Sequence, residues 1–208
     1  MVPDRDHVES WVADARAQGA HTLRTGALFP PAATAFLAVG FEVIDTLSLL
    51  ELDDLPVAAD APARNHDQPA ARLRRLRPSQ LDDAAIVDRH AFSAPWANNA
   101  AALHDIVTAT PRYRARCVHQ NGQMVAFSIS GRASTWGYLQ RLAVEPSARR
   151  RGLARLLVAD ALDWMRRRNV ERVLVNTATD NTAALTLYRS LGFIERPEHL
   201  TILERSLR

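Results

Sequence analysis

Residues 138–154 read YLQRLAVEPSARRRGLA, and the rest of the chain is arranged around this stretch. The apolar run 138–144 predicts a strand that breaks at Glu145-Pro146, and Leu153 begins an amphipathic segment that predicts a helix to about Arg168. An arginine–glycine turn joins them. Free backbone N–H groups and the positive end of a helix dipole then meet at one place, which suits an anion such as a phosphate. By itself, the turn is equally compatible with a solvated basic helix start.

A second pattern, residues 181–193, reads NTAALTLYRSLGF. Together the two stretches resemble the signature motifs of the GNAT acetyltransferase superfamily. Arg149-x-x-Gly152-x-Ala154 resembles the acyl-CoA pyrophosphate motif, Q/R-x-x-G-x-G/A, and residues 181–193 resemble the segment N-x-x-A-x-x-L-Y-x-x-x-G-F. The resemblance covers roughly residues 71–208.

The resemblance implies an α/β (α+β) fold of the GNAT acyl-CoA acyltransferase type, with a splayed, mixed, mostly antiparallel sheet flanked by helices. The residue patterns agree with this order of elements. Strands are expected at 71–76, 114–119, 124–130, 136–144, 172–177, 193–195 and 200–207, and helices at 81–92, 100–109, 153–168 and 181–191. Asn121-Gly122 predicts a two-residue hairpin turn. The sheet is expected to splay between the strands that end at Val144 and Thr177.

The N-terminal segment, residues 1–52, predicts helix, strand, helix and a long strand or strand pair. A shift of 152 residues places Gly40-Phe41 on Gly192-Phe193 and Phe36 on Tyr188. We therefore interpret it as a degenerate partial GNAT-like repeat, although two amphipathic segments can also match by coincidence. Residues 53–70 contain three prolines and predict a linker, which leaves 71–208 as the catalytic domain.

The resemblance assigns a role in binding acetyl-CoA, the implied co-substrate, to several residues. Backbone groups near the end of the strand would contact the pantetheine arm, although an ordinary strand edge explains them too: Leu142, Ala143 and Val144. The turn would hold the pyrophosphate, mostly through backbone N–H groups: Arg149, Arg150, Arg151, Gly152, Leu153 and Ala154. Asn181 is a natural N-cap and would also contact the CoA arm.

The set of candidate catalytic residues is less complete than the set of cofactor-binding residues. Tyr188 lies on the apolar face of its helix and reads either as a core tyrosine or, as the resemblance favours, as the acid that protonates the CoA thiolate. In bacterial N-terminal-alanine acetyltransferases of this family, a Glu stands five residues before the motif Asn. This chain has Asn176 there, which cannot accept a proton. Glu145 reads as a solvated turn residue. His119 and the pair Gln140-Arg141 are further candidates without support, and a chain of water molecules is the remaining alternative. No base is assigned.

The expected function is acetyl-CoA-dependent N-acetylation of a primary amine, on a small molecule or on a protein lysine or N-terminus, by direct attack in a ternary complex. An acyl-enzyme is not expected, because the only thiol, Cys117, falls in a hairpin strand away from both motifs. One alternative is a different acyl-CoA donor within the same enzyme class, and the other is a catalytically weak acyl-CoA-binding regulatory module. No acceptor can be inferred, and the acids of the first two helices read as helix-surface residues: Asp82, Asp83, Asp88 and Asp105.

Composition narrows the possible partners, cofactors and cellular location of the protein. The chain has 208 residues, is 47% hydrophobic and 24% charged, and carries a formal charge of +3, as an ordinary soluble globule would. All 26 basic residues are arginine, so the protein cannot acetylate lysines of its own. These arginines are spread out without interleaved aromatic residues, which argues against a nucleic-acid partner. One cysteine and scattered histidines predict no metal. Without a signal sequence or long apolar run, a cytoplasmic protein with no membrane partner is expected, and a homodimer is an expectation from the resemblance alone.

Overall fold

The computed structural model describes residues 2–53, 55 and 71–207, and the chain forms two compact units. One unit combines Met1–Glu51 with Asn176–Arg208, and the other comprises Leu52–Val175. Of the predicted linker 53–70, all but Asp53 and Leu55 lies outside the described residues. The division into segments 1–52, 53–70 and 71–208 therefore stays a prediction.

The unit Leu52–Val175 is built on a sheet with the strand order β7-β6-β5-β4-β3. Neighbouring strands are antiparallel except β6 and β7, which are parallel. The predicted hairpin turn is confirmed, since Asn121 and Gly122 have φ values of 50° and 82°, as a two-residue turn between antiparallel strands requires. The strands are β3 (Arg74–Arg75), β4 (Arg112–Gln120), β5 (Gln123–Ala133), β6 (Trp136–Val144) and β7 (Arg172–Ala178).

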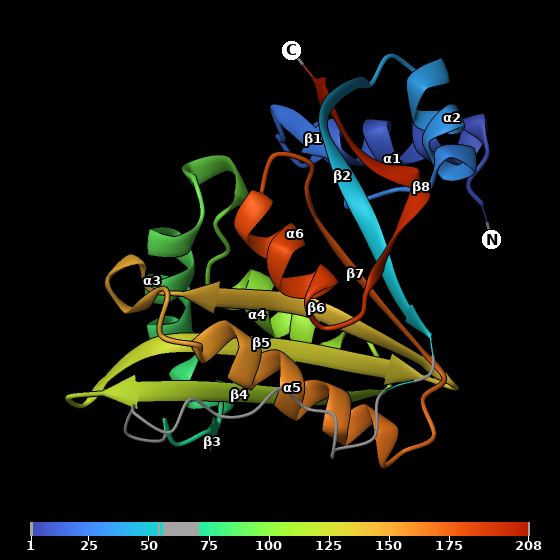
Figure 1. Cartoon of the computed structure of the whole chain (residues 1–208). Helices are drawn as coiled ribbons and strands as arrows, with labels where there is room; N and C mark the ends of the chain where they lie inside the picture. Colours follow the sequence, from blue (N-terminus) through green and yellow to red (C-terminus); the bar gives the residue numbers. More distant parts are fainter. Residues whose placement is uncertain (1, 54, 56–70, 208) are drawn as a thin grey trace. The chain divides into compact units, whose positions relative to one another are not determined.

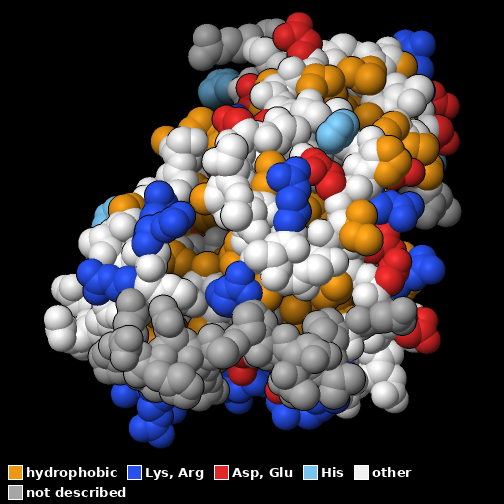
Figure 2. Space-filling model, viewed as in Figure 1, with side chains coloured by type: hydrophobic (Ala, Val, Ile, Leu, Met, Phe, Trp, Pro, Cys, Tyr) orange, Lys and Arg blue, Asp and Glu red, His pale blue; other side chains and the backbone are white. Residues whose placement is uncertain are grey.

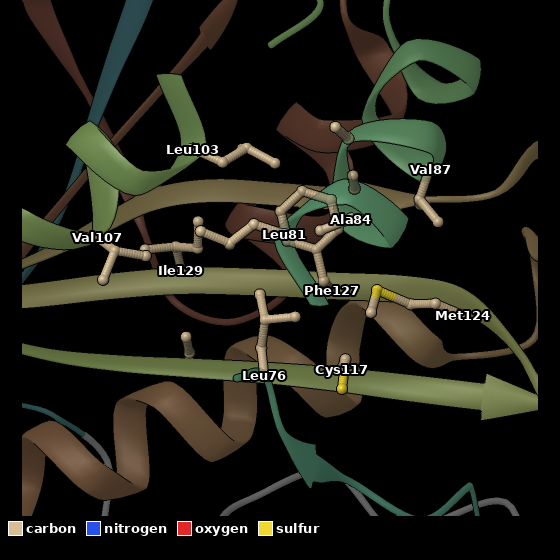
Figure 3. Packing of buried hydrophobic residues seen from close by; sticks show 13 residues of the cluster. Leu76, Leu81, Ala84, Val87, Leu103, Val107, Cys117, Met124, Phe127 and Ile129 are labelled. Carbon is tan, nitrogen blue, oxygen red and sulfur yellow. The ribbon is translucent and has the colours of Figure 1, made fainter. Parts of the chain in front are cut away.

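Three helices cover this sheet: α3 (Leu81–Ala91), α4 (Ala100–Thr108) and α5 (Leu153–Arg166). Helices α3 and α4 pack on one face, where Phe127 and Ile129 of β5 are fully buried (Figure 3). Helix α5 packs on the opposite face (Figure 1). There Leu157 shares a hydrophobic cluster with Val118 and Ala126. Removal of a ring such as that of Phe127 costs about 3–5 kcal/mol, so these two layers fix the sheet on which the candidate site is built.

Strands β6 and β7 separate soon after they begin. Their parallel pairing runs from Trp136 opposite Arg172 to Tyr138 opposite Leu174. Gly137 at this start lets α5 pack closely on β6, because a Cβ there would lie 2.6 Å from the sulfur of Met165. Within these described strands, residues 139–144 of β6 continue without pairing to β7, which confirms the predicted splay.

The other unit joins the N-terminal segment to the last strand. Strand β8 pairs antiparallel with β1 on one side and with β2 on the other. Leu203 of β8 is fully buried and shares a hydrophobic core with Val8, Val12 and Phe41. The elements of this unit are α1 (Arg5–Ala17), β1 (Thr22–Arg24), α2 (Pro30–Ala38), β2 (Glu42–Asp53), α6 (Thr182–Arg189) and β8 (Ile194–Ser206).

Two predicted strand boundaries were wrong. The strand expected at 71–76 is limited to Arg74–Arg75. The two closing strands expected at 193–195 and 200–207 form the single strand β8. Pairing with β2 carries this strand past Pro197, because the register shifts between Ser48 and Leu50 and leaves the proline at the irregularity, where no ladder N–H is needed.

Candidate functional site

The turn between β6 and α5 presents its backbone to solvent. A short 3₁₀ turn, Pro146–Ala148, leads into the arginines, and Arg150 and Gly152 both have left-handed φ values, of 63° and 73°. A Cβ on Gly152 would meet nothing within 4 Å, so the space beside this residue is open. A ligand can therefore approach the backbone closely at Gly152.

The start of α5, like those of α2 and α3, lacks the side-chain cap that α1, α4 and α6 have. Gly152 is its N-cap and supplies no side-chain hydrogen bond, and no acidic residue stands in the first turn. By contrast, Asn99 caps α4 by accepting from the N–H of Ala102, and Asp4 caps α1. The first N–H groups of a helix have no intrahelical acceptor, so the uncapped start of α5 offers donors and a positive dipole end to an anion.

The three arginines of the turn have different surroundings. Arg149 ties the turn to neighbouring elements, because Nε donates to the carbonyl oxygen of Val144 (3.3 Å) and Nη2 to that of Ala91 (3.2 Å). Arg151 donates to Oε1 of Gln120 at 3.4 Å. Arg150 is exposed. Arg149 thus shapes the turn, while the charges of Arg150 and Arg151 face solvent beside it.

The structure places the other predicted strand residues directly before the turn. Leu142 and Val144 are half-buried and Ala143 is buried, and all three pair with β5. They belong to the part of β6 that has left β7, so one edge of their backbone is free of β7. The unit thus brings together the predicted arm-binding strand, 142–144, and the predicted pyrophosphate turn, 149–154.

Glu145 is not the solvated turn residue that the sequence predicts. Its side chain is only 23% exposed, and Oε1 lies 2.7 Å from Nδ1 of His90 at the end of α3. Its second oxygen, Oε2, is buried and has no partner among the described residues. The carboxylate is therefore drawn inward by α3, and this could not be read from the Glu-Pro pair alone.

Asp88 is likewise not a helix-surface acid. It is fully buried, and both of its carboxylate oxygens accept from Arg141 of β6, at 2.6 and 2.7 Å. A local signal for this exists, because Leu81, Ala84, Ala85 and Asp88 follow one another at helical spacing along the apolar stripe of α3. Sequence reasoning missed this pair, whose arginine and aspartate side chains are 16% and 0% exposed.

Asn181 and Tyr188 belong to the unit that contains both chain ends, and their part in the same site stays a prediction. Asn181 caps α6, since its Oδ1 accepts from the N–H of Ala184 at 3.1 Å. Tyr188 is 5% exposed, and its ring lies 5.6 Å from that of Phe193. Burial raises the pKa of Tyr188 to about 12, so its phenol keeps its proton through the neutral range.

The sole thiol is unsuited to nucleophilic attack. Cys117 is fully buried in β4, and burial raises the pKa of the thiol.

Among the described residues, no group of three or more His, Cys, Asp or Glu side chains is arranged to hold a metal ion. None of the helices in residues 2–53, 55 and 71–207 combines the length and apolar character that a membrane crossing requires. On the face drawn in Figure 2, basic side chains lie in several separate groups.

Comparisons with known proteins agree with this geometry. The family model described as the acetyltransferase (GNAT) family matches residues 83–193, more than half of the chain. The [ribosomal protein bS18]-alanine N-acetyltransferase of Escherichia coli (strain K12) is 32% identical over 123 residues, which cover 59% of this chain and 80% of that protein.

Solved structures give the same result. The crystal structure of the ribosomal-protein-S18-alanine N-acetyltransferase from Escherichia coli is 26% identical with a TM-score of 0.55, covering 65% of this chain and 93% of that one. A tandem GNAT protein from the clavulanic acid biosynthesis pathway has a TM-score of 0.67 at 17% identity, covering 97% of this chain and 70% of that one. The second likeness is one of fold alone.

Proposed function

Since the chain belongs to the GNAT acetyltransferase family, we propose that it transfers the acetyl group of acetyl-CoA to a primary amine. The observation that carries the proposal is the turn 149–154. It combines an uncapped helix start, a left-handed glycine with open space beside it, and three exposed arginines, of which Arg150 and Arg151 are assigned to the ligand. These features fit a pyrophosphate, which needs backbone donors, room and positive charge.

The strand before the turn has a complementary role. We assign the pantetheine arm to the backbone of Leu142, Ala143 and Val144, in the manner of an added strand on a free edge. The pyrophosphate is assigned to the backbone N–H groups of Gly152, Leu153 and Ala154, with Arg150 and Arg151 adding charge. Arg149 supports the turn from behind, because its donors are bound to protein carbonyls. Asn181 adds a polar contact to the arm besides its cap.

The reaction is a direct attack in a ternary complex. The lone pair of the amine attacks the thioester carbonyl, the C–N bond forms, the C–S bond breaks, and the nitrogen gives up its extra proton. We assign Tyr188 to the departing sulfur, as the donor of a hydrogen bond. A phenol with a pKa of about 12 is a weaker acid than a thiol, whose ordinary pKa is about 8.5, so hydrogen-bond donation is favoured over complete proton transfer. The proton from the nitrogen passes to solvent water, and the CoA sulfur leaves as the thiolate.

The acceptor is proposed to be the α-amino group of a protein N-terminus. The support is the bacterial relative named as a ribosomal-protein alanine N-acetyltransferase, 80% of whose length this chain matches. Asn176, where that class has a Glu, is a departure that keeps small-molecule amines as the second candidate. A catalytically weak regulatory module is not favoured, because the relatives are named as acetyltransferases. A cytoplasmic location, a homodimer and the absence of nucleic-acid partners remain predictions.

Isothermal titration with acetyl-CoA tests the co-substrate site. We expect micromolar binding by the wild-type protein and its loss in Gly152→Trp. Gly19→Trp is a matched control, because Gly19 also has a left-handed φ, of 79°, and open space around its missing Cβ. Both variants carry the same backbone strain, on the order of 1–2 kcal/mol. Loss of binding in both variants, or in neither, would remove the turn from the proposal.

An acceptor screen follows for the protein that binds acetyl-CoA. Peptides with a free N-terminal alanine are compared with the same peptides acetylated in advance and with small primary amines, and release of free CoA thiol is measured. We expect turnover with the free peptides. Turnover with small amines alone would make the second candidate the acceptor class.

A further inference from the structure

Strand β6 contains a β-bulge one residue before Arg141. Ser130 of β5 lies opposite Leu139 and Ile129 lies opposite Arg141, which leaves Gln140 as the extra residue. A bulge breaks the alternation of side chains along a strand. Gln140 donates to the carbonyl oxygen of Ile106 in α4, and Arg141 binds Asp88 in α3. Two consecutive residues of β6 therefore point to the same side, toward α3 and α4.

Arg141 and Asp88 form a bidentate pair in the interior of this unit. Nε of Arg141 donates to Oδ2 of Asp88 at 2.7 Å and Nη2 to Oδ1 at 2.6 Å. The side chain of Asp88 is fully buried, and that of Arg141 is 16% exposed. Burial of two charges is unfavourable unless further hydrogen bonds satisfy them. The groups that satisfy them come from the segment between α3 and α4.

That segment, residues 92–99, is held to the pair at several points. Oδ1 of Asp88 also accepts from the backbone N–H of Asn98 at 2.7 Å, and Nη2 of Arg141 donates to the carbonyl oxygen of Trp96 at 2.8 Å. The guanidinium carbon of Arg141 lies 3.5 Å from the centre of the Phe92 ring. The side-chain amide of Asn98, with its oxygen turned toward Arg141, accepts from Nη2 at 3.0 Å. The ion pair thus fixes the backbone and one ring of the segment.

We propose that Asp88 and Arg141 are positioning residues that hold the segment 92–99 as a wall of the amine-acceptor site. The inference rests on the proposed function. Arg141 directly precedes residues 142–144, which are assigned to the acyl arm, so a segment bound to Arg141 lies beside the strand that carries the acetyl group. Phe92 and Trp96, both half-buried, give this wall its aromatic character.

The pair also sets the charge of the wall. A primary amine reaches the enzyme mostly as an ammonium ion. Asp88 neutralises Arg141, so the wall presents no net charge from this pair to the incoming cation. Loss of the carboxylate alone would leave an arginine charge in a poorly solvated place, where it repels an ammonium more strongly than it would in water.

Asp88→Asn and Arg141→Lys test the proposal. The first removes the negative charge at nearly constant shape, and the second keeps the positive charge but not the two-point contact. With an N-terminal-alanine peptide as acceptor, we expect Asp88→Asn to raise the KM for peptide about tenfold, as loss of one charge-assisted hydrogen bond would. The dissociation constant for acetyl-CoA should be unchanged. Arg141→Lys should give a smaller change of the same kind.

Hydrogen exchange supplies a readout that needs no acceptor. In Asp88→Asn, amide exchange across residues 92–99 should accelerate at least tenfold, because the N–H of Asn98 loses its carboxylate. Asp160→Asn is the matched control. Asp160 accepts from Arg114 in the same two-point way, at 2.6 and 2.8 Å, but joins β4 to α5. The Asp160→Asn variant should be less stable than the wild type, while its KM for the peptide and the amide exchange rates of residues 92–99 stay unchanged.

The possible results distinguish a failure of this inference from a failure of the proposed function. If Asp88→Asn lowers stability as Asp160→Asn does and leaves both the peptide KM and the exchange of 92–99 unchanged, the pair is only structural and the inference is overturned. Faster exchange with an unchanged peptide KM would also overturn it, because the segment would then not form the acceptor wall. If the wild type turns over no amine while it binds acetyl-CoA, the proposed function fails, and the exchange experiment still decides whether the pair positions the segment.

Discussion

Tyr188 is the residue on which the proposed departure of CoA depends. Tyr188→Phe removes only the phenolic oxygen from a buried ring, so the fold and the acetyl-CoA affinity should be kept. We expect turnover to fall about 10²–10⁴-fold, the range of a lost proton donor or acceptor in catalysis. Stopped assays of the variant beside titration with acetyl-CoA measure both quantities. Turnover within a factor of about two of the wild type would reduce Tyr188 to a core tyrosine.

The raised pKa of Tyr188 also has a consequence for stability at high pH. Burial lifts it from 10 to about 12, so unfolded chains lose this proton before folded ones do. The folded state therefore binds more protons between about pH 10 and 12, and its stability falls as the pH rises through that window. A difference titration of tyrosinate absorbance between wild type and Tyr188→Phe should show the midpoint near 12. A midpoint near 10 would mean that the ring is solvated.

The pKa of Asp160 is shifted in the opposite direction, so its effect on stability depends on pH in the opposite way. Burial alone would raise its pKa, but the hydrogen bonds and charge of Arg114, aided by Arg116, outweigh burial and lower it. The stabilisation is present above the ordinary value of 3.8 and is lost as the pH falls below it. Asp160→Asn should cost about 1–3 kcal/mol at pH 7, and its gap from the wild type should narrow toward pH 3. Denaturant unfolding at both pH values tests this, and a gap independent of pH would contradict it.

At the scale of single elements, Asn181 at the start of α6 has two predicted roles: it caps the helix and it contacts the CoA arm. Asn181→Ala should lower stability by about 1 kcal/mol through loss of the cap, and Asn99→Ala at the start of α4 is the matched loss of a cap of the same kind. Asn181→Ser keeps a capping oxygen but removes the amide. If the amide contacts the CoA arm, the serine variant should bind acetyl-CoA more weakly while its stability is kept. Unchanged affinity in the serine variant would leave the cap as the only role of Asn181.

Elements were predictable where their signals are local. Proline and glycine at helix ends, and Asn121-Gly122 in the hairpin, place most helices and strands within a few residues of the structure. The turn 149–154 is local as well. The spacing of Asp88 on α3 is a local sign of its burial, but its partner Arg141 stands 53 residues away and the partner of Glu145, His90, 55 residues away, so neither pairing could be read from local sequence. The length of β8 depends in the same manner on β2.

At the scale of the whole molecule, helix ends offset by 152 residues have the same geometry. Phe41 donates its N–H to the carbonyl oxygen of Phe36 at 3.1 Å, and Phe193 does so to Tyr188 at 3.1 Å. Gly40 and Gly192 are both left-handed, with φ values of 84° and 90°. Two helices that end in the same way before a strand support the interpretation of residues 1–52 as a degenerate repeat.

The pairing of β2 with β8 adds a second, independent correspondence. Leu47 lies opposite Leu200 and Ser48 opposite His199. A shift of 152 residues places Leu47 on His199 and Ser48 on Leu200, so each residue faces the equivalent of its neighbour. Such a register is that of two equivalent strands about a local two-fold axis, as in a symmetric dimer. If residues 1–52 are a degenerate repeat, as we propose, the N-terminal segment takes the place that a second copy of the C-terminal strand would take.

This arrangement predicts what removal of residues 1–70 would do. Strand β8 would lose both neighbours, β1 and β2, and Leu203 would lose Val8, Val12 and Phe41 from its core. An exposed apolar strand with free edges pairs with other chains. We expect the fragment 71–208 to self-associate or to be insoluble in size-exclusion analysis, and co-expression of residues 1–70 as a separate chain to restore a soluble complex. A folded, monomeric fragment 71–208 would show that the N-terminal segment is an appendage, because the C-terminal strand would then need no second copy to cover it.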